Sequence, residues 1–128
     1  MYVYVSSTDS LTLHPENTPS NFIVQLPQYI RFDEGEWTCG VVQCMLPKRV
    51  SKNVYITSDF VESSVLHGRL QPVLCMTTVK TKEFIQVKYV PVKRNQISTL
   101  RIKLVNRRGE EVNFTEDETL LVLEFRQK

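Results

Sequence analysis

The strongest strand pattern of the chain is Glu36-Trp37-Thr38-Cys39-Gly40-Val41-Val42-Gln43-Cys44-Met45-Leu46, which Pro47 ends. Successive side chains of a strand point to opposite faces. The odd-numbered residues from Trp37 to Met45 therefore share one face, on which only Gln43 is polar. The even-numbered residues from Thr38 to Leu46 share the other. Both faces are largely apolar, which predicts a central strand that is covered on both sides.

Shorter apolar runs flank this strand, and turn signals separate them about every 8–15 residues. They predict eight to ten strands and no helix, the clearest over 1–6, 21–26, 54–57, 74–79, 84–92, 100–104, 110–114 and 119–125. Pro27 is expected to close the second of these, because proline cannot donate to a strand ladder. Residues 59–71 have weak periodicity and are expected to form a loop that crosses from one sheet to the other. Asn106 to Gly109 is expected to form a hairpin turn.

The composition supports an all-β chain. Its 128 residues are enough for one domain with one core, and no alanine, the best helix former, is present. The apolar residues are mainly β-branched and aromatic, the types that fit a pleated surface. With this many strands, two packed sheets are expected rather than one open sheet.

Residue types that carry catalysis or bind metals are sparse. His14 and His67 have no second ligand at metal spacing, so we expect both to be loop or surface residues. Cys39, Cys44 and Cys75 form an odd set. The first two lie five apart in one strand and are expected on opposite faces, so all three are predicted to be small buried thiols in a reducing compartment, the cytosol or nucleus. The acidic groups at 33–36 and 116–118 are expected to be solvated turns. We therefore expect no cofactor, no metal and no enzyme activity.

The formal net charge of +2 is too small to predict nucleic acid or an anionic membrane as the main partner. Basic residues recur near predicted strand ends, at Lys48-Arg49, Lys80 with Lys82, Lys93-Arg94 and Arg107-Arg108. They are expected to be solvated, with a patch that touches nucleic acid or an acidic partner as the alternative. No apolar run approaches the roughly 20 residues of a membrane span. The opening, Met1 to Val5, is expected to be a strand and not a signal peptide.

The order of the motifs is more specific than any one of them. Residues 13–27, with Pro15, Asn17-Thr18, Phe22 and Leu26-Pro27, run into Gly35-Glu36-Trp37 and the strand after it. Five further motifs follow in order: Ser58-Asp59-Phe60-Val61-Glu62, Tyr89-Val90-Pro91-Val92, the run from Ile97 to Leu104, Val112-Asn113-Phe114, and the run from Leu121 to Arg126. This ordered set spans nearly the whole chain. It resembles the penton (vertex, or minor capsid) proteins of Polinton-like viruses, adintoviruses and their adomavirus-like relatives.

The resemblance implies a single jelly roll over residues 1–128, with two four-stranded antiparallel sheets packed face to face. It further implies a structural capsid protein of the virion, made inside the host cell, whose homopentamers occupy the fivefold vertices of an icosahedral shell. The implied partners are other copies of the chain, a double-jelly-roll major capsid protein and a fibre or spike protein. Any contact of the basic loops with nucleic acid is expected to be non-specific.

Loops and edge strands are the expected subunit contacts, because edge strands need cover. The candidate interface residues are Met1, Tyr2, Tyr4, Asn17, Lys48, Arg49, Phe60, Glu62, Arg69, Lys93 and Arg94. One alternative is a stand-alone β-sandwich module that binds carbohydrate or nucleic acid, with Tyr29, Tyr55 and Phe60 as its candidate aromatics. The other is a small enzyme on a β scaffold, which the motifs do not support.

Overall fold

The computed structural model describes residues 1–32, 35–47, 53–78, 81–114 and 117–128. Within these ranges the chain forms strands, turns and bends and no helix. The strands are β1 (Tyr2–Ser6), β2 (Asn21–Arg31), β3 (Trp37–Met45), β4 (Val54–Ser58), β5 (Ser64–Leu66), β6 (Arg69–Gln71), β7 (Val73–Thr77), β8 (Thr81–Glu83), β9 (Val90–Pro91), β10 (Gln96–Val105) and β11 (Leu120–Gln127). The described residues contain no helix long and apolar enough to cross a membrane.

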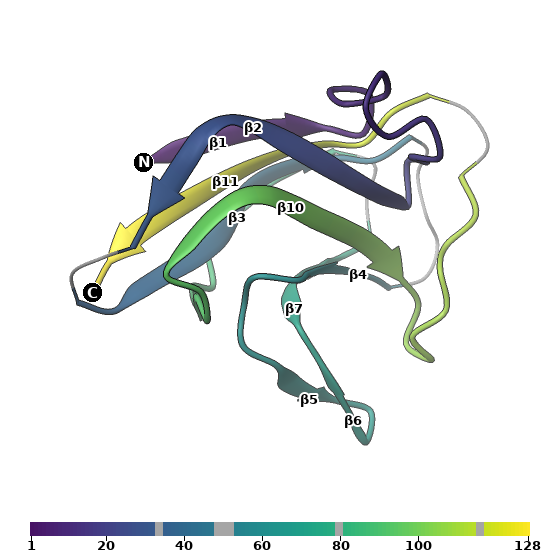
Figure 1. The fold of residues 1–128 in the computed structure, drawn as a ribbon. Coiled ribbons are helices and arrows are strands. Elements are labelled where there is room, and N and C mark those ends of the chain that lie inside the picture. The colour runs from purple at the N-terminus through teal and green to yellow at the C-terminus, as the bar shows by residue number, and fades with distance from the viewer. Residues whose placement is uncertain (33–34, 48–52, 79–80, 115–116) are drawn as a thin grey trace.

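The strands form two antiparallel sheets that pack face to face (Figure 1). The first sheet has the order β1-β11-β3-β8, and the second has the order β2-β10-β4-β7. β9 pairs with β3 at Thr38 and Cys39, whereas β8 pairs with β3 at Gln43 to Met45. β8 and β9 therefore occupy one strand position in turn, and each sheet has four positions. The chain changes sheet at most of its connections, which gives the jelly-roll topology. The predicted β-sandwich is confirmed.

The core lies between the sheets and is closed at one end by aromatic rings. Phe32 packs against Trp37 and Phe125, with ring centroids 5.5 and 5.4 Å apart, and Phe60 packs against Phe125 at 5.6 Å. Phe60 is fully buried. Its assignment as an interface residue and a ligand-binding aromatic was wrong, because this ring fills the core.

β3 is central, as predicted, but the expected assignment of its faces was wrong beyond Val41. In the pairing with β11, Leu123 is opposite Val41 and Val122 is opposite Gln43, so Val42 is an extra residue. Such a bulge reverses the alternation of the residues that follow. Cys44 therefore joins Cys39 in the core, and Gln43 and Met45 face outward. All three cysteines are free, Cys75 is half-buried, and burial raises the pKa of each thiol.

β2 does not end at Pro27. It continues to Arg31, because its pairing with β10 is interrupted where the proline lies: Gln25 pairs with Thr99 and Ile30 with Ile97. Four residues of β2 thus stand opposite one residue of β10. Pro27 lies in this bulge, where the ladder requires no N–H donor at its position.

Three other expectations fail where the chain leaves the sheets. Residues 59–71 return to the sheet they left, since β4 pairs with β7, and they contain the antiparallel hairpin of β5 and β6. Of the predicted strand 84–92 only β9 is a strand, and Ile85 is 99% exposed. Segment 110–114 keeps one bridge, between Val105 and Glu111. The turn before it is present, and Gly109 has the expected positive φ of 84°.

Candidate functional site

The outer edge of β1 has main-chain groups without a partner. Met1 and Phe125 exchange two main-chain hydrogen bonds of 3.1 and 2.8 Å, and Ser7 donates to the carbonyl of Thr119. Bonded pairs alternate along an antiparallel ladder. Tyr2, Tyr4 and Ser6 therefore direct their N–H and C=O groups away from β11.

Asp9 ends this free edge at Ser6. Its carboxylate accepts a 2.9 Å hydrogen bond from the Ser6 N–H, and its own N–H donates to the Ser6 carbonyl at 3.1 Å. The main-chain groups of Tyr2 and Tyr4 have no such partner among the described residues. Both side chains are exposed, and Tyr4 is 73% exposed. The open part of β1 is therefore short, uncharged and aromatic.

The outer edge of β2, in the other sheet, is closed from Asn21 to Gln25. The Asn17 carboxamide accepts from the Ile23 N–H at 3.0 Å and donates to the Ile23 carbonyl at 2.9 Å. The Ser10 hydroxyl accepts a 2.9 Å hydrogen bond from the N–H of Gln25. Proteins close edges in this way because free edges pair with other chains. Of these two outer edges, that of β1 is the one left open for a contact.

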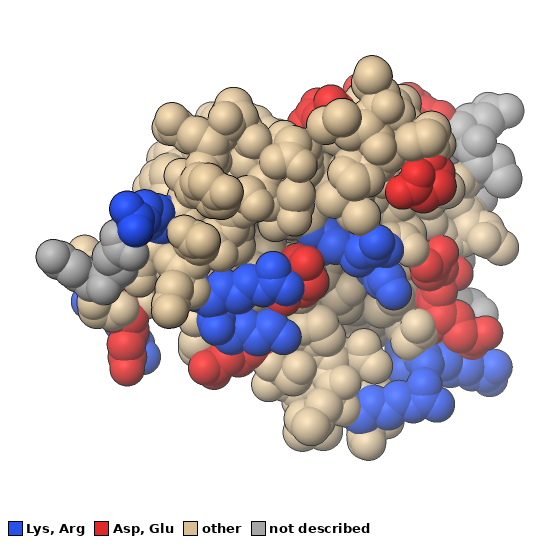
Figure 2. Space-filling model, viewed as in Figure 1, with Lys and Arg blue, Asp and Glu red and all other residues tan. Residues whose placement is uncertain are grey.

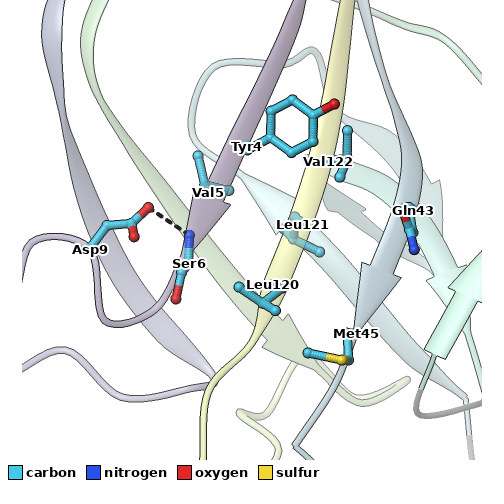
Figure 3. Close-up of a pocket in the computed structure, with 9 residues that line it drawn as sticks. All are labelled: Tyr4, Val5, Ser6, Asp9, Gln43, Met45, Leu120, Leu121 and Val122. Carbon is cyan, nitrogen blue, oxygen red and sulfur yellow. Dashed lines mark hydrogen bonds between the residues drawn. The ribbon is translucent and has the colours of Figure 1, made fainter.

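A groove lies beside the free edge, on the outer face of β1, β11 and β3. Its volume is about 330 Å³. Figure 3 shows the ring of Tyr4 beside Val122, and the side chains of Leu120 and Met45 further along the same face. These residues share the face because the register aligns Tyr4 with Val122 and Leu120 with Met45. The bulge at Val42 brings Met45 to this side. We call this site the β1 groove.

One carboxylate, that of Asp9, lines the β1 groove, and two more belong to partners of lining residues. Glu83 is the cross-strand partner of Gln43 and shares its face. Glu118 accepts hydrogen bonds from the Ser6 hydroxyl at 2.5 Å and the Thr8 hydroxyl at 2.7 Å. These two bonds hold the pKa of the Glu118 carboxyl below its ordinary value. The groove thus has an apolar floor and an acidic rim.

The candidate interface residues fall in separate places. Tyr2 and Tyr4 lie on the free edge of β1, and Met1 precedes the strand and is exposed. Glu62, Lys93 and Arg94 line a polar groove of about 490 Å³ at the end of the sandwich, beside Trp37.

Other candidates are engaged within the chain or lie elsewhere. Asn17 binds the edge of β2 at Ile23. Arg69 is exposed and donates to the Arg108 carbonyl at 2.6 Å. Lys48 and Arg49 lie outside the described residues. Tyr55 is buried, so of the three aromatics expected for a binding module only Tyr29 is exposed.

No protein-family model matches the chain, and no curated protein matches it. Among the described residues, no three His, Cys, Asp or Glu side chains gather as metal ligands would. His14 lies 3.7 Å from the Glu16 carboxylate, and His67 is at the tip of the β5–β6 hairpin.

The β5–β6 hairpin was missed from the sequence, although Gly68, a residue type that turns favour, stands between its two strands. His67 and Gly68 have φ values of 47° and 81°, the two positive values that a tight two-residue hairpin turn requires. Val65 and Leu70 are direct cross-strand partners and are 74% and 71% exposed. We call this exposed pair the hairpin knob. Figure 1 shows the hairpin projecting from the sandwich at the bottom of the view, with β1 at the top.

Basic side chains surround the hairpin knob. Arg69 reaches the 106–109 turn. Its guanidinium lies so close to Gly109 that a Cβ added to this glycine would be 3.6 Å away. Arg107 lies 3.5 Å from Nδ1 of His67, and Nε2 of His67 is 3.1 Å from the Tyr55 hydroxyl. Figure 2 shows blue side chains at the lower right, beside the hairpin. These contacts hold the hairpin and the turn together and concentrate positive charge there.

Proposed function

We propose that this chain is a structural capsid protein, the penton (minor capsid) subunit that forms homopentamers at the fivefold vertices of an icosahedral shell. The ordered motifs that resemble penton proteins support this proposal. So does the jelly roll, a topology found in viral capsid domains. In this role the protein acts through its shape and its contacts within the virion.

The observation that carries the proposal is the free edge of β1. A strand edge with unpaired N–H and C=O groups and large exposed aromatic side chains pairs readily with another chain unless it is covered. Here the edge lies beside an apolar groove, and exposed apolar patches of this kind mark interaction sites. A neighbouring subunit would provide the missing cover.

A ring also needs two different surfaces on each subunit, because its contacts are head-to-tail. The chain has apolar residues exposed in separate regions: Tyr4 on β1, and Val65 and Leu70 on the hairpin. In the proposed shell the ring is seated among double-jelly-roll major capsid proteins. The polar groove with Lys93 and Arg94 is the candidate surface for the contact with these major capsid proteins.

The oligomeric state tests the proposal directly. Native mass spectrometry of the purified chain is expected to give a particle of five 14.9 kDa subunits, and negative-stain images are expected to show rings with fivefold symmetry. A monomer at all concentrations would contradict the proposal. A monomer that retains a carbohydrate or an oligonucleotide would support the stand-alone binding module instead.

A further inference from the structure

We propose that the hairpin knob of one subunit inserts into the β1 groove of a second copy of this chain. This inference rests on the proposed assembly of the chain into rings and identifies the two surfaces that would meet.

The shapes of the two surfaces are complementary. The hairpin knob protrudes, since Val65 and Leu70 stand side by side on a two-stranded hairpin that projects from the body (Figure 1), and Val65 also lines a hollow between the hairpin and β7. The β1 groove is concave, and its floor is formed by aliphatic side chains such as Leu120 and Val122 (Figure 3). Inserting the pair into the groove would remove both apolar surfaces from water, which favours association.

Their charges are complementary as well. Arg69, Arg107 and Arg108 flank the hairpin knob, and none of them has an ion pair within the described part of the chain. Asp9 lines the β1 groove, and Glu83 and Glu118 are partners of the lining residues Gln43 and Ser6. Placing a basic rim against an acidic rim steers the encounter and fixes its orientation. A groove bordered by carboxylates favours this occupant over an acidic partner.

The position of the two surfaces makes the contact head-to-tail. The hairpin lies at the opposite side of the molecule from β1, so a subunit cannot fill its own groove (Figure 1). Each copy can therefore offer its knob to one neighbour and its groove to another. Contacts between two different surfaces build rings when the rotation closes.

Two exposed positions allow the contact to be broken from either side. Leu70→Asp places a charge on the knob, and Tyr4→Asp places one beside the groove; both side chains are exposed, so folding should be retained. Each variant alone is expected to raise the dissociation constant of self-association at least about tenfold. Ile85→Asp and Tyr29→Asp are the matched controls, because these residues are also exposed but lie outside both surfaces. Both variants should assemble like the parent chain.

Mixing the two variants gives the decisive readout. The Leu70→Asp chain keeps an intact groove and the Tyr4→Asp chain keeps an intact knob, so one intact interface remains. An equimolar mixture is expected to form a heterodimer by native mass spectrometry, weaker at high salt because charges contribute. A mixture that stays monomeric, or single variants that form rings like the parent, would overturn the inference. Leu70→Ser replaces Leu70→Asp if circular dichroism shows that the latter is unfolded.

The same measurements separate the two proposals. Parent rings that are insensitive to both substitutions would reject the knob-in-groove contact but leave the capsid role standing. A parent chain that stays monomeric would reject both.

Discussion

The hydroxyl of Tyr89 donates a 2.5 Å hydrogen bond to Oε1 of Glu124, and this bond fastens the 84–89 segment across the outer face of the first sheet. The guanidinium of Arg126 lies 4.5 Å from the centre of the Tyr89 ring and 3.4 Å from the other carboxylate oxygen of Glu124. Glu124 is buried although it faces outward, because the segment covers it. A charge is thus held under a loop by one hydroxyl and one guanidinium.

Replacing Tyr89 with phenylalanine is expected to lower the free energy of unfolding by about 1–2 kcal/mol, because the buried carboxylate loses a charge-assisted hydrogen bond. Urea denaturation followed by tryptophan fluorescence measures the change. Tyr2→Phe is the control, since the Tyr2 side chain is exposed, and it should stay within about 0.5 kcal/mol of the parent. Equal effects of the two substitutions would show that the Tyr89 bond contributes no stability.

Acid is expected to destabilise the fold through Glu124 and Glu118. The Tyr89 hydrogen bond, aided by Arg126, lowers the pKa of Glu124 against the opposing effect of burial, and the Ser6 and Thr8 hydroxyls lower that of Glu118. A carboxyl whose folded pKa is depressed stabilises the fold above its unfolded pKa of about 4.3, and this stability is lost as the pH falls through the folded value. Urea midpoints from about pH 6 to about pH 3 should therefore decrease.

Glu124→Gln gives the control for this pH dependence, because it removes one titrating group and should flatten the slope. A variant with the parent's slope would exclude Glu124 as a contributor. At alkaline pH the sign is reversed: the Glu124 bond raises the pKa of Tyr89, so its contribution is present below about pH 10 and lost above.

Gly40 is expected to tolerate no side chain. A Cβ there would lie 2.5 Å from a methyl group of Val87 and 3.0 Å from the carbonyl oxygen of Lys88. Gly40→Ala should therefore displace the 84–89 segment and lower the free energy of unfolding by about 1–3 kcal/mol. Limited proteolysis should cut the variant faster within this segment. Gly68→Ala is an unsuitable control, because Gly68 has a positive φ. The double variant Gly40→Ala/Val87→Ala is compared instead; it removes the methyl group that the new Cβ would meet and should regain part of the lost free energy of unfolding.

Asn17→Ala is expected to open the edge of β2. The substitution removes both hydrogen bonds to Ile23, which should cost about 1–2 kcal/mol, and it exposes an edge that can pair with other chains. Light scattering and thioflavin fluorescence at raised temperature should show faster aggregation than the parent. Asn113→Ala, at an exposed position, is the matched control. Aggregation at the same rate in both variants would mean that Asn17 does not protect the edge.

Much of the fold could be predicted from alternation alone. The strands around Val41, Ile102 and Leu123 were found because each follows a regular pattern of buried residues, and such a pattern is written into a few consecutive residues. The sandwich followed from the number of these strands. Alternation failed at Met45, because a bulge is an irregularity of pairing between β3 and β11 that the residues of β3 do not reveal.

The candidate site depended far more on distant partners. The position of β1 at an edge that needs cover was partly expected. The groove, however, exists because Tyr4, Met45 and Val122 meet on three neighbouring strands, although they lie far apart in the sequence. Phe84 to Tyr89 alternates like a strand, yet it crosses the outer face of the sheet, where Gly40 leaves room. A single sequence does not state which segments will become neighbours.

The all-β class could be predicted from the chain alone, as could the residues apolar enough to be buried, since strand alternation and burial preference are properties of short segments. Three features depend on the folded chain: the open edge of β1, the carboxylates near the groove, and the exposure of Val65 and Leu70 at one place. These features arise from register, bulges and capping between residues far apart in the chain. Their energies depend on the partner as much as on the residue itself.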